Sequence, residues 1–225
     1  MAKSLPNDRS LLDRYGLPPE AIGRESRARI DRALGRPLPG SAAEQALARR
    51  LIYASGDLEL ADLVRVSPSA PEAGVRALRA GAAIVCDVQM VAAGLNRPLR
   101  HRLGCPLLCA TCQAGAVERA RAEGITRTAA GLLLLAERLD GAVVAIGNAP
   151  TALLALLDLV DAGRAAPALV VGMPVGFVAA SEAKQLLQER AVPFVTVVGT
   201  RGGSPLAVAT VNLLLTWAAG DGVPR

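Results

Sequence analysis

Residues 142–151 read Ala-Val-Val-Ala-Ile-Gly-Asn-Ala-Pro-Thr, and this stretch indicates how the chain folds. Five apolar residues in a row predict a strand that is buried on both faces, as in a parallel sheet covered by helices. The glycine-containing loop that follows opens a helix. The stretch therefore predicts one β-loop-α unit.

Similar units recur from residue 63 onward, where short apolar runs alternate with longer amphipathic ones. The strand candidates are residues 64–66, 83–86, 107–110, 142–146, 169–171 and 194–198. The helix candidates are residues 72–80, 88–95, 114–123, 127–139, 151–162, 180–190 and 206–219. This alternation predicts an α/β fold with three layers, doubly wound, around a mainly parallel sheet of five to six strands.

The first 60 residues differ from the rest of the chain. They carry many charges, and their apolar residues recur at helical spacing, which predicts two helices and no strand. Residues 35–40 form a break rich in glycine and proline, and Ser41 is a candidate N-cap. We expect a single domain over residues 1–225, with residues 1–60 as an N-terminal helical extension packed on it.

Composition excludes several classes of protein. The 225 residues are 52% apolar, which excludes a disordered chain, and the aromatic content of 2% leaves few stacking platforms for single-stranded nucleic acid. The net charge of +5 comes from scattered arginines with no run of like charges, so no nucleic-acid partner is expected. Polar residues interrupt the apolar stretches and no signal peptide opens the chain, which predicts a soluble cytoplasmic protein with no membrane partner.

In doubly wound sheets, ligands bind outside the carboxyl ends of the strands. Asp87 follows one predicted strand, and glycine-rich loops at residues 147–151, 172–177 and 199–204 follow three others. Free N–H groups there predict a broad cavity with backbone donors, suited to a large ligand with several carboxylates or phosphates. Glycines also end strands in any α/β protein. A nucleotide-binding module is a further alternative, although neither a Walker A motif nor a G-x-G-x-x-G fingerprint is present.

Few side chains are suited to chemistry. The only histidine, His101, lies among charged residues and is interpreted as solvated, so a metal site is not expected. Cys109 and Cys112 form a C-x-x-C motif, for which a metal or redox role competes with the favoured interpretation as reduced structural cysteines. Tyr53 lies three residues after Arg50, so both project from a similar helix face, where a phenol can donate or accept a hydrogen bond.

Several long motifs in order resemble the precorrin-8X methylmutase (precorrin isomerase) family of cobalamin biosynthesis. They are residues 144–153, residues 172–178 with Ser-Glu-Ala-Lys at 181–184, and Gly-Gly-Ser at 202–204. Cys-Asp-Val-Gln-Met-Val at 86–91 and Thr-Arg-Thr at 126–128 fit the same pattern. The resemblance runs from about residue 26 to residue 215.

The resemblance implies a flavodoxin-like sheet, a homodimer and an active site near the dimer interface. It implies an isomerase that moves a methyl group from C-11 to C-12 of a polycarboxylate tetrapyrrole, giving hydrogenobyrinate, or cobyrinate if cobalt is already inserted. It implies no organic cofactor. The residues that we assign to substrate binding on this basis are Ser26, Arg50, Asp87, Arg127, Thr128, Asn148, Gly176, Arg201 and Ser204.

The sequence departs from the family pattern at the proposed catalytic position. The family has a histidine in a pattern like Arg-x-Ile-His-x-x-Gly-Asp, whereas residues 50–57 place Tyr53 there. Two hypotheses follow: an active isomerase in which Tyr53 is the catalytic residue, or a non-catalytic corrinoid-binding paralogue. A second departure is Thr200-Arg201, where Arg201 stands one position later than the family arginine.

Overall fold

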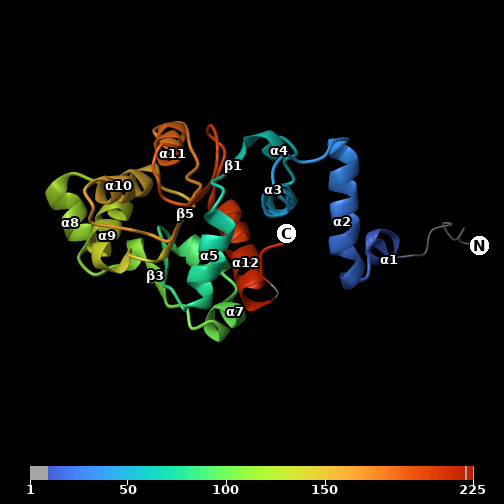
Figure 1. The fold of residues 1–225 in the computed structure, drawn as a ribbon, viewed down its shortest axis with the longest axis horizontal. Coiled ribbons are helices and arrows are strands. Elements are labelled where there is room, and N and C mark those ends of the chain that lie inside the picture. Colours follow the sequence, from blue (N-terminus) through green and yellow to red (C-terminus); the bar gives the residue numbers. More distant parts are fainter. Residues whose placement is uncertain (1–9, 221, 225) are drawn as a thin grey trace, which may run out of the picture. The chain divides into compact units, whose positions relative to one another are not determined.

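The computed structural model describes residues 10–220 and 222–224, and its centre is a six-stranded sheet (Figure 1). The strands are β1 (Val64–Val66), β2 (Ile84–Cys86), β3 (Leu107–Cys109), β4 (Val143–Ile146), β5 (Leu169–Gly172) and β6 (Phe194–Val197). Their order is β1-β6-β5-β4-β2-β3, with β1 antiparallel to β6 and all other pairs parallel. The predicted α/β class and mainly parallel sheet are confirmed.

The parallel strands place a topological switch point at the centre of the sheet. From β2 the chain passes to β3 on one side, and then to β4, β5 and β6 on the other. The resulting order, β3-β2-β4-β5-β6, is one of the two common orders of doubly wound sheets. Strands β2 and β4 pair in the register Val85↔Val144, so the loops that follow them leave the sheet side by side.

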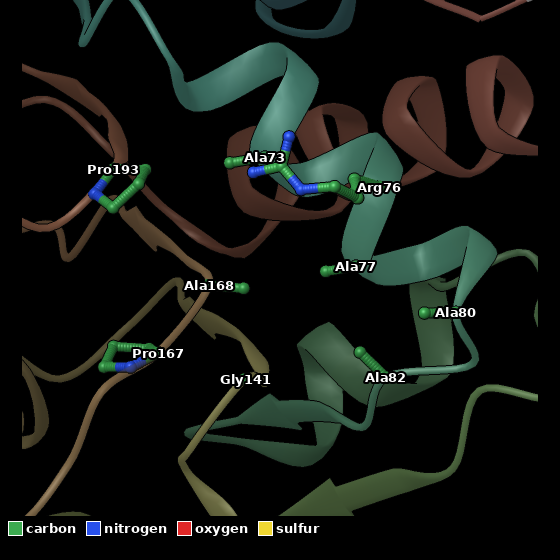
Figure 2. Close-up of a pocket in the computed structure, with 9 residues that line it drawn as sticks. All are labelled: Ala73, Arg76, Ala77, Ala80, Ala82, Gly141, Pro167, Ala168 and Pro193. Carbon is green, nitrogen blue, oxygen red and sulfur yellow. The ribbon is translucent and has the colours of Figure 1, made fainter.

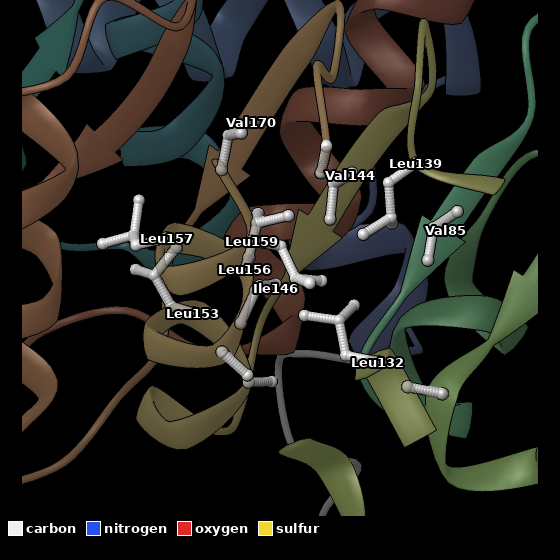
Figure 3. Packing of buried hydrophobic residues seen from close by; sticks show 14 of the residues in the cluster. Val85, Leu132, Leu139, Val144, Ile146, Leu153, Leu156, Leu157, Leu159 and Val170 are labelled. Carbon is white, nitrogen blue, oxygen red and sulfur yellow. The ribbon is translucent and has the colours of Figure 1, made fainter. Parts of the chain in front are cut away.

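Side chains on the two faces of the sheet enter two separate layers of helices. Val85, Val144 and Ile146 belong to the buried cluster on one face, together with Leu132 of α9 and with Leu153 and Leu156 of α10 (Figure 3); the same cluster includes Ala183 and Leu187 of α11. On the other face, α12 contacts β4, β5 and α5. Alternate residues of an apolar strand thus fill both faces, as the unbroken apolar runs predicted.

The helices follow the predicted alternation, with differences at several ends. They are α1 (Leu11–Tyr15), α2 (Pro19–Leu34), α3 (Ala42–Ser55), α4 (Leu60–Leu63), α5 (Ala70–Arg79), α6 (Gln89–Gly94), α7 (Arg97–Arg102), α8 (Ala116–Glu123), α9 (Arg127–Leu134), α10 (Pro150–Asp161), α11 (Ala180–Gln188) and α12 (Ser204–Ala219). Two 3₁₀ turns complete the list, η1 (Ala110–Cys112) and η2 (Ala136–Arg138). The predicted helix 127–139 is therefore α9 followed by η2.

The region before β1 contains more helices than the two that were predicted. The predicted N-cap is confirmed, because Ser41 and Glu44 form a reciprocal capping box at the start of α3. The short helices α1 and α4 were not predicted. Helix α3 buries Leu47, Leu51 and Ile52 and contacts α12.

The chain divides into two compact units after Pro37. The first contains α1 and α2, and the second contains the sheet with all other helices. The expected extension ended near residue 60, whereas α3 and α4 lie in the unit that contains the sheet. That the first unit packs on the second, within one domain, stays a prediction.

A membrane-spanning helix was not expected. Among the residues that the structure describes, no helix has the length and apolar character needed to cross a membrane.

Candidate functional site

Asp87 joins the two loops at the switch point. It is fully buried directly after β2, and its carboxylate accepts hydrogen bonds from four backbone N–H groups. One oxygen, Oδ1, accepts from Val88 at 3.0 Å and from Gly147 at 3.1 Å. The other, Oδ2, accepts from Asn148 and Ala149 at 2.8 Å each. The loop after β4 is thus fixed to the end of β2.

This arrangement corrects the expectation of free backbone donors in that loop. The N–H groups of residues 147–149 already bind a side chain of the protein, so they are not available to an anionic ligand. Asp87 itself is inaccessible, and its geometry is that of a residue that positions the loop rather than one that contacts a substrate. Asn148 is exposed beside it, so a side chain is presented at this point of the edge.

Hydrogen bonds between backbone groups join the loops after β5 and β6. The Gly176 N–H donates to the Thr200 carbonyl at 3.1 Å, and the Gly203 N–H donates to the Met173 carbonyl at 2.8 Å. At Gly202, where φ is +159°, a Cβ atom would lie 2.5 Å from the Met173 carbonyl oxygen. Only glycine allows this approach. The Gly-Gly segment therefore serves close loop packing, and two more of the expected donors are occupied.

Ser204 lies beside the loop after β4. A Cβ atom on Gly147 would be 2.7 Å from Ser204 Cα, so the start of α12 packs directly on that loop. Ser204 is itself buried. The loops after β2, β4, β5 and β6 thus form one continuous, tightly bonded edge.

An ion-pair cluster brings the segment of residues 50–57 to this edge. The Arg201 guanidinium binds Asp57 at 2.7 Å and also pairs with Glu59. The hydrogen bond to Asp57 and the charges of both carboxylates raise the pKa of Arg201 above its ordinary value. Arg201 thus links the loop after β6 to the residues that follow α3.

Tyr53 lies in the last turns of α3, on the same segment. It is 42% exposed, and the Arg50 guanidinium carbon lies 5.6 Å from the centre of its ring. This is the distance of a cation–π contact, which orients the two side chains relative to each other. The predicted pairing of Arg50 and Tyr53 is confirmed, and the phenol faces solvent.

A cluster of threonine hydroxyls lies at the starts of α9 and α10. Thr126 caps α9 by accepting from the Ala129 N–H, and its Oγ1 lies 2.7 Å from that of Thr151. Thr128, which is buried, adds a third hydroxyl 3.0 Å from Thr126. The exposed Arg127 donates to the Thr111 carbonyl. The sequence prediction included Arg127 and Thr128 and missed Thr126 and Thr151.

Lys184 is a buried cation that the sequence prediction quoted but did not assign. It lies on α11 with no exposed surface, and its ammonium donates to the Arg201 carbonyl. Burial lowers the pKa of Lys184 to about 8. The sequence contained a signal for this burial, because Lys184 occupies the apolar stripe formed by Ala180, Ala183 and Leu187.

The remaining candidates lie elsewhere. Ser26, on α2, is half-buried within the first unit, and its assignment to the site stays a prediction. His101 is exposed on α7, as expected. The four cysteines are free; Cys112 is exposed, whereas Cys86 and Cys109 are buried as predicted. Over residues 10–220 and 222–224, no group of three or more His, Cys, Asp and Glu side chains has the arrangement of a metal site.

A pocket of about 430 Å³ lies at the opposite edge of the sheet (Figure 2). It is lined by residues that precede the strands, among them Ala82, Gly141, Ala168 and Pro193, and by α5. In doubly wound folds, ligands bind at the carboxyl ends of strands, and this pocket is at the amino ends. The candidate site is therefore the edge formed by the loops described above.

These features define the class of the protein: a doubly wound α/β fold whose carboxyl edge presents arginine and polar side chains on interlocked loops. The model of the family described as precorrin-8X methylmutase matches residues 21–217. The chain belongs to the precorrin-8X methylmutase family.

Relatives and a solved structure agree. A "Precorrin-8X methylmutase" of Pseudomonas aeruginosa is 48% identical over 203 residues, covering 88% of this chain and 95% of that protein. A "Cobalt-precorrin-8 methylmutase" of Priestia megaterium is 38% identical over 196 residues, covering 87% of each. The crystal structure of a precorrin-8X methylmutase from Thermus thermophilus has a TM-score of 0.83 at 42% identity, covering 91% of this chain and 98% of that one. The comparisons support an isomerase and give no support to the non-catalytic alternative.

We predict that Asp87→Asn weakens the fold more than an ordinary buried substitution. The amide nitrogen of Asn cannot accept a hydrogen bond, so N–H donors that the carboxylate satisfies lose their partner. We expect the free energy of unfolding to fall by about 2–4 kcal/mol, measured by urea denaturation. Asp140→Asn is the matched control, because within the described part of the chain the Asp140 carboxylate accepts only from the Ala166 N–H, and Asn can do the same. Equal losses in both variants would contradict the role of Asp87.

We also predict that the free energy of unfolding of the wild type, compared with that of Lys184→Met, depends on pH. Above about pH 8 the folded protein has released the Lys184 proton, whereas the unfolded chain keeps it up to about pH 10.5. The unfolded state then binds more protons, so the wild type gains stability as pH rises. Relative to the variant, it should gain about 2 kcal/mol between pH 7 and pH 10. A difference that stays constant over this range would show that the Lys184 pKa is not lowered.

Proposed function

We propose that this chain moves a methyl group from C-11 to C-12 of precorrin-8X, or of cobalt-precorrin-8, in cobalamin biosynthesis. The product is then hydrogenobyrinate or cobyrinate. The observation that carries the proposal is the ion pair of Arg201 with Asp57, because it holds the segment of Arg50 and Tyr53 at the carboxyl edge of a sheet whose family performs this reaction. The names of the relatives support both forms of the substrate.

The substrate carries many carboxylates, and guanidinium groups are the side chains best suited to bind them. We assign Arg50, Arg127 and Arg201 to this task. Arg201 already pairs with Asp57 and Glu59, but its side chain is still 45% exposed, so a ligand carboxylate can reach it. We also assign Asn148, Thr128, Ser204 and Gly176 to substrate binding, although Thr128 and Ser204 are buried in the unbound chain. The assignment of Ser26 stays a prediction. The loops support this assignment in one respect: because the N–H groups of residues 147–149, Gly176 and Gly203 are occupied, charged side chains are the main donors left for the ligand.

We assign Asp87 and Lys184 to positioning. Asp87 sets the course of the loop that presents Asn148. Lys184 donates a hydrogen bond to the Arg201 carbonyl, so it fixes the backbone position from which the Arg201 side chain extends. Neither needs to contact the substrate for its loss to weaken binding.

Tyr53 is the proposed catalytic residue. Its phenol is exposed and stacked by Arg50, so its hydroxyl is free to donate a hydrogen bond to a ring nitrogen or to developing charge on the macrocycle. General acid catalysis by a positioned group typically contributes about 10²–10⁴-fold to a rate. Substrate binding that is stronger in the transition state supplies the rest.

The homodimer and the cytoplasmic location implied above stay predictions. So does the absence of an organic cofactor and of a nucleic-acid partner. Exposed apolar side chains in the loop after β5, Val175, Phe177 and Val178, are consistent with a surface that another molecule covers at this edge.

The purified chain should convert precorrin-8X or cobalt-precorrin-8, which is measured by the absorbance change that accompanies methyl migration. We expect Tyr53→Phe to lower kcat by about 10²-fold, because it removes the hydroxyl and keeps the ring. Tyr53→His should keep or raise the rate. The matched control is Tyr15→Phe, at the chain's other tyrosine, which should leave turnover unchanged.

Two outcomes would contradict the proposal at different points. Tight pigment binding without any spectral change would exclude the isomerase. Normal turnover by Tyr53→Phe would remove Tyr53 from the mechanism and leave the reaction in place.

A further inference from the structure

Three cysteines lie at the carboxyl ends of β2 and β3 and in the turn that follows β3. Cys86 and Cys109 are paired residues on the neighbouring parallel strands β2 and β3, so their side chains project from the same face of the sheet. Cys112 ends η1, the 3₁₀ turn that follows β3. Cys109 is the residue directly before this turn, so the C-x-x-C spacing places the two cysteines at the two ends of one short turn.

The thiols of Cys109 and Cys112 are close enough to influence each other's ionisation. Both thiols have further partners: Cys109 Sγ lies 3.3 Å from Thr111 Oγ1, and Gln89 Nε2 donates to Cys112 Sγ at 3.3 Å. Neither sulfur is part of a disulfide. Both thiols are thus free, and each is held by a neighbouring polar side chain.

The two thiols differ in environment. Cys109 is 9% exposed, and burial raises its pKa. Cys112 is exposed; its small degree of burial opposes ionisation, but the hydrogen bonds from Cys109, Gln89 and Thr111 and the charge of Arg127 lower its pKa overall. Since the thiolate is the nucleophile in thiol–disulfide exchange, Cys112 is the sulfur that reacts first.

We propose that Cys109 and Cys112 form a redox-active pair that closes a disulfide when the protein meets a small-molecule disulfide such as oxidised glutathione. The Cys112 thiolate attacks one sulfur of the oxidant, which breaks its S–S bond and releases one glutathione thiolate. The Cys109 thiol then loses its proton and attacks Cys112 Sγ, which releases the second glutathione. The protein loses two protons and two electrons, and one oxidised glutathione becomes two reduced molecules.

The pair is connected to the candidate site through Thr111, which lies between the two cysteines. The Thr111 N–H donates to the Asp87 carbonyl at 3.2 Å, and the Thr111 carbonyl accepts from Arg127. A disulfide between Cys109 and Cys112 would therefore move the Thr111 backbone, whose carbonyl accepts the hydrogen bond from Arg127. The oxidation itself is independent of the proposed reaction and is tested without a tetrapyrrole.

The test is oxidation of the full chain in buffers of increasing oxidised-to-reduced glutathione ratio, followed by intact mass and trypsin mapping. Cleavage after Arg102 and Arg119 leaves Cys105, Cys109 and Cys112 in one peptide, so Cys105→Ser is used to place the bond. Cys105 is a suitable control because it is buried apart from the pair, with its thiol 3.3 Å from the Leu78 carbonyl. We expect Cys105→Ser and the wild type to lose two hydrogens at the same ratio.

Two variants separate the steps. Cys109→Ser should accumulate a glutathione adduct on Cys112, because the resolving thiol is gone, and Cys112→Ser should form neither adduct nor internal disulfide. In the wild type, iodoacetamide should alkylate Cys112 before the other cysteines, a measurement that needs no variant to fold. The proposal is overturned if wild-type Cys112 keeps glutathione without closing a disulfide, if all four thiols stay free at high ratio, or if another cysteine reacts first.

Discussion

The carboxylate of Asp87 is the interaction on which the carboxyl edge of the sheet depends. It lies at the point where the strand order reverses, and it binds the N–H groups of a loop that starts sixty residues later in the chain. Four charge-assisted hydrogen bonds offset the cost of keeping the carboxylate out of water. They leave one arrangement for the loop, because losing the bond from Gly147 or from Ala149 leaves a buried donor without a partner. The neighbouring start of α12 then packs on this fixed loop through Gly147.

This constraint changes the way in which the edge could bind an anion. A helix start or a glycine loop with free N–H groups would bind carboxylates through its backbone. Here three loops use those groups to bind each other, and the surface left over carries side chains: Asn148, Arg127, Arg201 and the hydroxyls near Thr126. Arg201 is an example of such a side chain. Its guanidinium forms an ion pair with Asp57, and its backbone carbonyl accepts a hydrogen bond from Lys184. Specificity in such a site comes from the placement of side chains on a rigid backbone.

Much of the fold could be predicted because several local signals agreed. At residues 142–161 an apolar run, a glycine loop and a helical pattern all indicate β4 followed by α10, and both form. The antiparallel direction of β1 could not be predicted, because a three-residue strand carries no signal for its partner. Helix α7 was missed since its six residues show no apolar stripe; it depends on Asn96, which caps it by accepting from the Leu99 N–H.

Some contacts within the candidate site could be predicted from the sequence, and others could not. Arg50 and Tyr53 were placed together correctly, because both lie on one helix at a spacing of three. Asp87 was assigned to the ligand, whereas its partners are residues of the protein that only the tertiary fold brings near. Lys184 and the ion pair of Arg201 with Asp57 also join elements far apart in sequence. Of these residues, only Lys184 could be recognised from the sequence alone, because it is a lysine on an apolar helix stripe.

The most direct measurement is amide hydrogen exchange, followed by NMR, at the loop after β4. If the Asp87 carboxylate holds this loop, the amides of Asn148 and Ala149 exchange as slowly as those of β4, although Asn148 is exposed. Exchange as fast as at the exposed residues Phe177 and Val178 would show that these hydrogen bonds do not hold the loop, and would contradict the account.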